Sequence, residues 1–521
     1  MLDAKKVILT LADNTTNTIT DSSRLSTEED YSAVIYSKED LIINGNGTLN
    51  VNAGYRNGIK STDGCIIVSG TLNITSTEDG IIGKDLCGIV AGDININAGS
   101  DGIKSTYDTD TTKGNVIIEG GNITIKASND GIQAENILVI NDGTINIKTN
   151  NGAADTTQTH IDNMDMGRGG FGFNNNKTTT TTDDTSESRK GIKAGNMLII
   201  NDGDITIDSD DDSVHCNSVI YIYGGTINAA TGDDGVHADD LLTVNGGTIN
   251  ITQCYEGLEA DDIVINDGDI SVVSSDDGIN SSDGSITING GNLLINASGD
   301  GLDANGSIII NGGYIVVLGP TSDGDTAIDY DDSCTINGGT VMAFGSSGML
   351  EIPKGASNGA CIVTAFTSVS GGSKYTLSDS NGNEILSYTP SKAYAAAIVY
   401  SDKITTGNTY NITAGSTTLS IEVTSDVTSN VSSGFGGAGG MNKPGNGGSG
   451  MPNNGSSDNG MNGNSNGSMP DMSGNGAPDM NGNSSGDMPS MGGNSSNNSG
   501  NMPNMNNGSS NVNAPQMNNR M

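Results

Sequence analysis

Residues 231–251 read TGDDGVHADDLLTVNGGTINI, and this stretch decides the fold. It contains three short runs, GVHA, LLTVN and TINI, in which apolar and polar residues alternate. A period of two is typical of β-strands, and the Asp, Asn and Gly residues between the runs are typical of tight turns. The stretch therefore predicts three strands and three corners in one unit of about 22 residues.

The same unit recurs along most of the chain. Each copy carries a marker glycine in a DGI-like tripeptide, and these glycines are Gly58, Gly80, Gly102, Gly131, Gly191, Gly235, Gly257, Gly278 and Gly301. Ser213 takes this place in one copy, and most steps are 21–23 residues, with longer steps of 29 and 60. One unit cannot bury its apolar face alone, so the copies must stack. We predict an all-β fold, a right-handed single-stranded parallel β-helix with coils about 4.8 Å apart.

Residues of one kind fall into columns when the copies are aligned. The position after the marker forms an inward aliphatic column of Ile59, Ile81, Ile103, Ile132, Ile192, Val214, Val236, Leu258, Ile279 and Leu302. A polar column of Asn245, Asn266, Asn289 and Asn311 falls at one corner. We expect the amides of this second column to hydrogen-bond from coil to coil.

The repeat also predicts the domain boundaries. Residues 1–40 are expected to form an N-terminal cap over the first sheet edge, and residues 41–345 the β-helix, with a flexible insertion at 150–190. Residues 346–425 lose the 22-residue period and predict a C-terminal β cap or small β domain. Residues 432–521 are Gly, Asn, Ser and Met with almost no aliphatics, which predicts a disordered tail; a wall-facing or assembly role is the alternative.

The charge balance limits the partners. The chain has 62 acidic and 22 basic residues, a formal net charge of −40. Such a surface repels nucleic acid, which needs Lys and Arg for phosphate contacts. It favours divalent cations as partners, although high charge also serves solubility alone. No segment is long and apolar enough to span a bilayer, and the first residues lack the apolar core of an export signal.

Acidic residues recur in register at two corners of each coil. The first corner holds Asp79, Asp101, Asp130, Asp211, Asp212, Asp233, Asp234, Glu256, Asp276, Asp277 and Asp300, and the second holds Asp85, Asp239, Asp240, Asp261, Asp262 and Asp283. Stacking places the carboxylates of a column about 5 Å apart, where they require a cation or raise each other's pKa. Calcium takes six to eight oxygen ligands, so these columns predict Ca²⁺ between coils. The alternative is that Asp-Gly merely suits the turn.

A second column of polar residues lies two positions after each marker. Its members Lys60, Lys104, Lys193, His215 and His237 are candidate carbohydrate-binding residues, and later coils carry Glu259, Asn280 and Asp303 there. The early basic half predicts a groove for an anionic polymer along the axis. His215 and His237 are expected one coil apart; surface imidazoles are the simpler interpretation, and a metal pair or proton transfer is the alternative.

The six cysteines show no metal-binding spacing. Cys65 and Cys87 lie 22 residues apart, which places them in one column of neighbouring coils. A buried column of free thiols is the simpler interpretation, since Cys packs as a small hydrophobe, and a disulfide is the alternative.

Several segments together resemble a bacterial family of β-helical carbohydrate-binding domains related in fold to pectate lyases. They include INGNGTLNV, DGIIGKD, DGIKS and GNVIIEGGNITI, the segment YTLSDSNGNEILSYTPSKAYAAAIVYS, and the Met-, Gly- and Asn-rich stretches at 164–176 and after 432. The resemblance covers roughly residues 1–425. It implies an exported, calcium-binding protein at the cell surface that binds plant cell-wall polysaccharide, such as polygalacturonate or cellulose. The calcium ligands would lie among the acidic corners named above.

Three functional hypotheses follow. The first is a non-catalytic polysaccharide-binding protein, which without Trp would use hydrogen bonds and calcium bridges to carboxylated sugars. The second is a calcium-dependent polysaccharide lyase with Lys104 or Lys193 as the base. Only five arginines occur, and none is expected on a strand beside an acidic cluster, which weighs against a lyase. The third is a structural or adhesive spacer at the cell surface.

Overall fold

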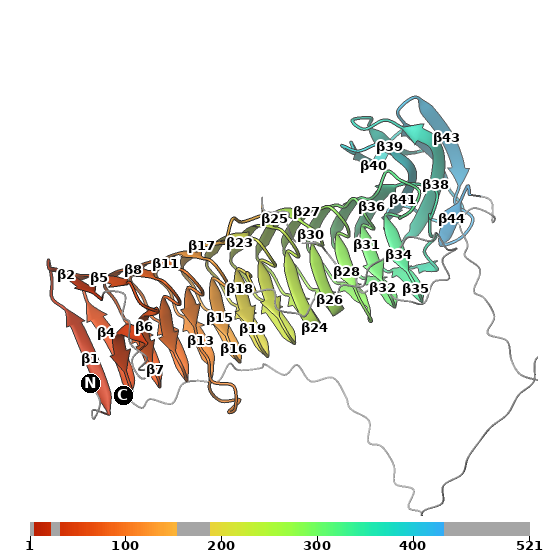
Figure 1. Ribbon diagram of the computed structural model, residues 1–521. Helices are drawn as coiled ribbons and strands as arrows, with labels where there is room; N and C mark the ends of the chain where they lie inside the picture. Colours follow the sequence, from red (N-terminus) through yellow and green to blue (C-terminus); the bar gives the residue numbers. More distant parts are fainter. Residues whose placement is uncertain (1–4, 22–31, 154–187, 432–521) are drawn as a thin grey trace, which may run out of the picture. The chain divides into compact units, whose positions relative to one another are not determined.

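The computed structural model describes residues 5–21, 32–153 and 188–431. These belong to one compact unit, Met1–Met441. The regular elements of the described residues are all β-strands, and the coils stack along one axis (Figure 1). The predicted tail at 432–521 and most of the predicted insertion at 150–190 lie outside the described residues.

Three parallel ladders of strands make up the stacked coils. The first contains β3 (Ala33–Ser37), β6 (Asn57–Ser61), β9 (Ile81–Gly83), β12 (Ile103–Lys104), β15 (Ile132–Ala134), β18 (Ile192–Ala194), β21 (Val214–Cys216), β24 (Val236–Val244), β26 (Leu258–Ile265), β28 (Ile279–Ser281), β31 (Leu302–Ala304) and β34 (Ile328–Tyr330). The second contains β1 (Lys6–Leu11), β4 (Asp40–Gly45), β7 (Gly64–Ile67), β10 (Leu86–Ile89), β13 (Asn115–Ile118), β16 (Ile137–Ile140), β19 (Met197–Ile200), β22 (Val219–Ile222), the second halves of β24 and β26, β29 (Ile286–Ile288), β32 (Ser307–Ile310), β35 (Ser333–Ile336) and β37 (Gly355–Ala356). The third contains β2 (Thr16–Thr20), β5 (Thr48–Ala53), β8 (Thr71–Ser76), β11 (Asp93–Ala98), β14 (Asn122–Ala127), β17 (Thr144–Thr149), β20 (Asp204–Ser209), β23 (Thr226–Thr231), β25 (Thr248–Cys254), β27 (Asp269–Ser274), β30 (Asn292–Asn296), β33 (Tyr314–Leu318) and β36 (Thr340–Gly345). The predicted all-β parallel solenoid, with three strands per coil, is confirmed.

The inward columns pack as the sequence predicts. In the first ladder Ile59 pairs with Ile81, and Val214 pairs with Val236, and all four side chains are fully buried. The marker glycines allow this close stacking. A Cβ atom on Gly257 would lie 2.2 Å from the carbonyl oxygen of the next coil's marker. The repeat of glycine at this position is thus a packing requirement.

The cysteines also follow the prediction of free thiols. Cys65 and Cys87 lie side by side in β7 and β10, and both are fully buried and unbridged. Burial raises the pKa of the Cys65 thiol to about 12. The column therefore acts as part of the apolar core.

The asparagine column forms a continuous chain of hydrogen bonds, as expected. The amide of Asn266 donates to the side-chain oxygen of Asn245 at 2.9 Å, and Asn289 donates to Asn266 at 2.8 Å. Asn311 donates to Asn289 at 2.8 Å, and Asn337 continues the chain at 3.0 Å. The amides of Asn266, Asn289 and Asn311 both donate and accept, so these side chains satisfy one another along the axis.

The N-terminal boundary differs from the prediction. Strand β1 already pairs in parallel with β4 from Lys6 to Leu11, and β2 pairs with β5 from Thr16 to Thr20. Residues 6–20 therefore belong to the first coil of the solenoid, and the parallel pairing starts well before residue 41. The alternating run KVILTL has the same pattern as later coils, which explains its place in the ladder.

A different arrangement follows the last parallel strands. Strands β38 (Ala360–Val369), β41 (Tyr394–Ser401) and β44 (Val427–Ser429) extend the third ladder, and β41 runs antiparallel to β36. Strands β39 (Tyr375–Asp379), β40 (Glu384–Tyr388), β42 (Thr409–Ala414) and β43 (Thr417–Glu422) form a separate four-stranded sheet. A second core joins Phe344 of β36 to Tyr375 and Tyr394. The outward residues of β33 and β36 are apolar because this core covers them.

Candidate functional site

The acids before the marker glycines form one column and hold neighbouring coils together. Oδ1 of Asp79 accepts the backbone N–H of Asp101 at 3.1 Å, and Oδ1 of Asp101 accepts that of Asp130 at 3.0 Å. The same bond recurs at the pairs Asp212–Asp234, Asp234–Glu256 and Asp277–Asp300. One oxygen of each of these carboxylates thus accepts a backbone hydrogen bond from the next coil, and the second oxygen can contact other groups.

The candidate carbohydrate-binding residues lie in register on the first ladder. Lys60 and Lys104 both pair with Ile82, which lies between them, and Lys193 of β18 pairs with His215 of β21. His215 pairs in turn with His237 of β24, one coil away as predicted. The five residues therefore share one face of the solenoid.

Lys190 occupies the acid column between Asp130 and Asp212, where most other coils carry an acid. Its backbone N–H donates to Asp130 at 2.8 Å, and its Nζ donates to Asp211 at 2.9 Å and to Asp212 at 2.5 Å. Although burial opposes it, Lys190 and the neighbouring histidines hold the pKa of Asp212 well below its usual range. Lys190 thus supplies this part of the column with a positive charge from within the protein.

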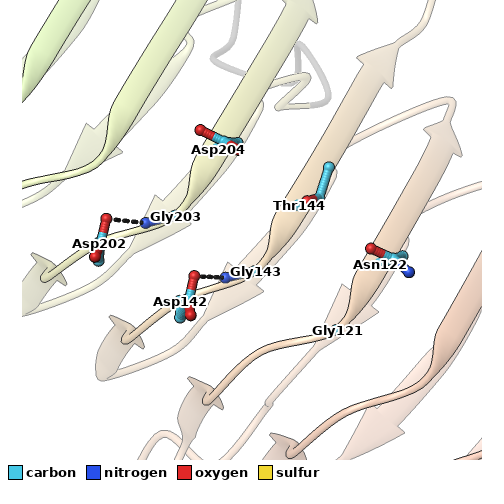
Figure 2. Close-up of a pocket in the computed structure, with 8 residues that line it drawn as sticks. All are labelled: Gly121, Asn122, Asp142, Gly143, Thr144, Asp202, Gly203 and Asp204. Carbon is cyan, nitrogen blue, oxygen red and sulfur yellow. Dashed lines mark hydrogen bonds between the residues drawn. The ribbon is translucent and has the colours of Figure 1, made fainter.

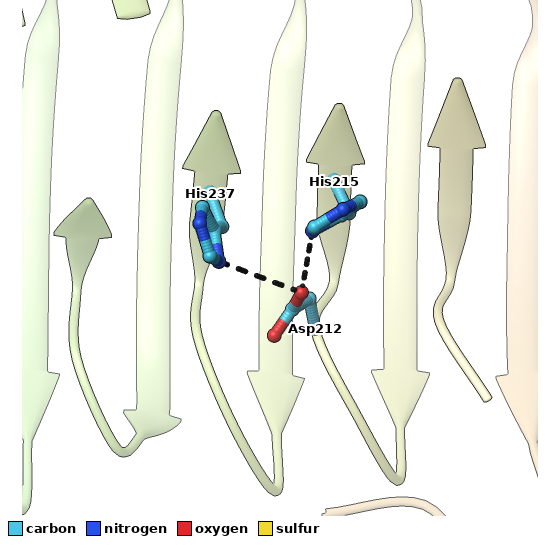
Figure 3. A group of neighbouring side chains, drawn as sticks. All are labelled: Asp212, His215 and His237. Atoms are coloured by element: carbon cyan, nitrogen blue, oxygen red, sulfur yellow. Dashed lines mark hydrogen bonds and ion pairs between the residues drawn. The ribbon is translucent and has the colours of Figure 1, made fainter. Parts of the chain in front are cut away.

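Both histidines approach the same buried carboxylate from neighbouring strands, as Figure 3 shows. Nδ1 of His215 lies 2.8 Å from Oδ2 of Asp212, and its Nε2 lies 2.8 Å from the side-chain oxygen of Asn217. His215 is only 8% exposed, so the interpretation as a surface imidazole is wrong for this residue. Both ring nitrogens of this buried histidine therefore have a side-chain partner, Asp212 and Asn217.

His237 lies near four carboxylates, whereas His215 contacts one. Its Nδ1 lies 3.2 Å from Oδ2 of Asp234, 3.3 Å from Oε2 of Glu259 and 3.8 Å from Oδ2 of Asp212. Its Nε2 lies 3.6 Å from Oδ1 of Asp239. Burial alone would lower the pKa of His237, but the surrounding carboxylates raise it to about 10. This group is the most densely charged part of the face.

The next coils carry acids without basic partners. Carboxylate oxygens of Asp277, Asp300 and Asp303 lie within 4.8 Å of one another. No ion pair joins these three side chains to a lysine, arginine or histidine among the described residues. Burial and mutual repulsion raise the pKa of Asp277 to about 8; burial, opposed by a backbone hydrogen bond, raises that of Asp300 to about 9. Three oxygen-only side chains with unbalanced charge fit a hard divalent cation such as calcium.

Apart from Asp239, which lies near Nε2 of His237, the second acidic corner is not part of these groups. In the part of the chain that the structure describes, the side chains close enough to share an ion come from the first corner and the column beside it. Asp240 instead accepts a hydrogen bond from Ser218 at 2.7 Å, and Asp262 accepts the backbone N–H of Ser285 at 2.9 Å. Asp261 accepts from Ser282 at 3.0 Å. These acids bind turns of neighbouring coils.

A family comparison adds to this geometry. A family model described as carbohydrate-binding domain-containing protein matches residues 1–235 and 233–419. The chain belongs to this family. A carbohydrate-binding domain-containing protein of Acetivibrio thermocellus is 37% identical over 75 residues, which are 14% of this chain and 26% of that relative. The match spans about a quarter of the relative's length, and no solved structure matches the chain.

Membership in the carbohydrate-binding domain family supports polysaccharide as the class of partner.

An open polar hollow of about 320 Å³ lies on the neighbouring face, where the third-ladder strands begin (Figure 2). It is lined by Gly121, Asn122, Asp142, Gly143, Thr144, Asp202, Gly203 and Asp204. Asp142 and Asp202 each accept the N–H of the following glycine, at 2.7 and 2.8 Å, and their other oxygens are available to hydroxyl groups. The described residues contain no helix of the length and hydropathy that crossing a membrane requires.

The lysines proposed as lyase bases have partners in the structure. Nζ of Lys104 lies 2.5 Å from Asp101, and this carboxylate raises the pKa of Lys104 against the effect of burial. Nζ of Lys193 donates to Ser188 at 3.2 Å. A general base needs its unprotonated form, which the Asp101 contact disfavours at Lys104.

Sequence reasoning missed the partners of four important side chains. Lys190 follows the 60-residue interruption of the repeat and was not assigned to the acid column. It directly precedes the marker Gly191, so aligning the markers could have assigned it there. Glu259 and Asp303 were recognised as outward residues, but not as partners of the acid column. Arg189 was not expected beside acids, yet it pairs with Asp210 at 2.7 Å.

Proposed function

We propose that this protein is a non-catalytic polysaccharide-binding protein of the cell surface that binds acidic glycans with the help of calcium. Asp277, Asp300 and Asp303 would supply the carboxylate oxygens for the ion. Bound calcium would bridge these oxygens to the carboxylates of a polyuronate such as polygalacturonate. The observation that carries the proposal is the unbalanced charge of these three side chains.

The face around this group suits a long polymer. Neighbouring coils repeat the outward position in register, from Glu259 through Asn280 to Asp303. Asn280 donates to Glu256 at 2.8 Å, so its amide is already oriented by the acid column. A chain lying along the axis would meet one such position per coil, about every 4.8 Å. The polar hollow of Figure 2 would offer further hydrogen-bond acceptors to sugar hydroxyls.

The test is retention of the full chain on polygalacturonate and on cellulose, each with calcium and with a chelator. We expect calcium-dependent retention on polygalacturonate, and a loss of most of it in Asp303→Asn. Asp283→Asn is the matched control, because it removes the same charge from an exposed acid of the second corner. Retention that persists in the chelator, or that Asp283→Asn reduces equally, would contradict the proposal.

The same experiment separates the alternative functions. The soluble fraction is read for ultraviolet absorbance of unsaturated sugar ends, which only lyase chemistry produces. Rising absorbance would make the protein a lyase. If the protein is not retained and no absorbance develops, the structural spacer is the remaining hypothesis.

A further inference from the structure

The group around His237 differs chemically from the oxygen-only group at Asp277, Asp300 and Asp303. It combines one imidazole nitrogen with carboxylates from two neighbouring coils: Asp234, which precedes β24, and Glu259 on β26. Nitrogen is a poor ligand for calcium and a preferred one for zinc and related transition metals. The two groups therefore call for different ions.

The distances fit a small tetrahedral ion. Metal–ligand bonds of about 2.0–2.1 Å place neighbouring ligand atoms of a tetrahedron about 3.3 Å apart. Nδ1 of His237 lies 3.2 Å from Oδ2 of Asp234 and 3.3 Å from Oε2 of Glu259. Both distances are longer than the roughly 2.7–2.9 Å that is usual for a hydrogen bond between a protonated nitrogen and a carboxylate.

The groups behind these ligands are already oriented. Oδ1 of Asp234 accepts the backbone N–H of Glu256 at 3.3 Å, which leaves Oδ2 facing the imidazole. On the other side of the ring, Oδ1 of Asp239 lies 3.6 Å from Nε2 of His237. A carboxylate near the second ring nitrogen is the usual support of a metal-bound histidine.

The charge balance also favours a divalent cation. Lys190 supplies a single positive charge to Asp211 and Asp212, and the carboxylates of Asp234 and Glu259 share the imidazole of His237. One divalent ion would balance these two carboxylates and leave His237 neutral, as a metal ligand must be. The side chains of His237 and Glu259 are 26% and 20% exposed, so a fourth position would be open to solvent.

We infer that Asp234, His237 and Glu259 form a site for a transition metal of the Zn²⁺ class, separate from the calcium group at Asp277, Asp300 and Asp303 and not requiring a bound polysaccharide. The protein's three ligands leave one coordination position for water or an incoming oxygen ligand. His215 is not part of the ligand set, because Asp212 and Asn217 occupy both of its ring nitrogens.

The test uses the full chain, stripped with a chelator and titrated with Zn²⁺ by calorimetry and with Co²⁺ by visible absorption. We expect a Zn²⁺ site that excess Ca²⁺ does not displace, with a Co²⁺ spectrum of low coordination number. His237→Gln should weaken Zn²⁺ binding at least tenfold and remove the Co²⁺ band, while His215→Gln and Asp303→Asn should keep both. Thermal melting in chelator shows that each variant is folded, and Glu259→Gln provides a second ligand variant.

Three results would overturn the inference. Unchanged Zn²⁺ binding in folded His237→Gln would exclude the imidazole as a ligand. An equal loss in His215→Gln would place the ion between the two histidines and refute the ligand set. Full displacement by millimolar Ca²⁺ would show a site without transition-metal preference. None of these readouts involves a glycan, so failure here is distinguishable from failure of the proposed function.

Discussion

The substitution Asp300→Asn should make the protein more stable without calcium and less responsive to it. Asparagine keeps the side-chain oxygen that accepts the backbone N–H of Thr326, and it removes only the charge. Carboxylate oxygens of Asp300 lie within 4.8 Å of those of Asp277 and Asp303. At an effective dielectric constant of 20, each ionised pair at this separation repels by about 3 kcal/mol.

Partial solvent exposure and proton uptake reduce this repulsion, so we expect a net gain of about 1–3 kcal/mol in chelator. For a unit of this size, that gain corresponds to a rise in melting temperature of roughly 1–4 °C. In calcium this advantage of the variant should shrink or disappear. At a hundred times the dissociation constant, a bound ion stabilises the parent chain by about 2.7 kcal/mol, and the variant forfeits most of this.

The assay is thermal melting of the parent chain, Asp300→Asn and the control Asp283→Asn, each in chelator and in millimolar calcium. The control should shift little in either buffer, since its side chain is exposed and apart from the group. A variant that is less stable than the parent in chelator would refute the argument from repulsion. An undiminished response to calcium would refute the assignment of the ion to this group.

Three further outcomes are expected. Lys392→Met should destabilise the last coils by about 1–3 kcal/mol, because the Lys392 ammonium donates to the carbonyl oxygens of Ala297 and Leu318. The measurement is hydrogen exchange of the backbone amides in β33, and an unchanged exchange rate would contradict this expectation. Glu351→Gln should raise the melting temperature at pH 8 and progressively less towards pH 5. Burial raises the pKa of Glu351 to about 7, so the folded protein takes up this proton at a higher pH than the unfolded chain does. The buried charge therefore destabilises the folded protein by about 1–2 kcal/mol at pH 8, and this cost disappears on acidification. A change in melting temperature that does not depend on pH would contradict this expectation. The six buried thiols should react with a thiol reagent only after denaturation, and fewer than six reactive groups in the denatured chain would reveal a disulfide.

The sequence predicted the ladder positions well because one residue per coil fixes the rest. Once the marker glycines are aligned, the pairing of His215 with His237 and of Cys65 with Cys87 follows by counting. The asparagine column followed in the same way. In a parallel stack of equal coils, register along the chain is register in space.

The side-chain partners within a coil were harder to predict. Alignment shows that Asp234, His237 and Glu259 are neighbours, but not which oxygen turns towards the ring. That choice depends on the backbone N–H of Glu256, which occupies the other oxygen of Asp234. The insertion also interrupts the repeat before Lys190, so the cation that pairs with Asp211 and Asp212 was not recognised.

The position of that one cation explains why the acid column does not behave uniformly. Around Lys190 the carboxylates have a partner within the chain, and the pKa of Asp212 is lowered. Two coils later an imidazole is the remaining counter-charge, and beyond Glu259 the described outward column carries no basic residue. There burial, together with repulsion from neighbouring carboxylates, raises the pKa values of Asp277 and Asp300. Since every coil offers nearly the same backbone, the demand for an external cation is set by the side chain at one position per coil. Placing a lysine at Asn280 should therefore reduce the calcium response without changing the coil, because its ammonium would lie in the column between Glu259 and Asp303.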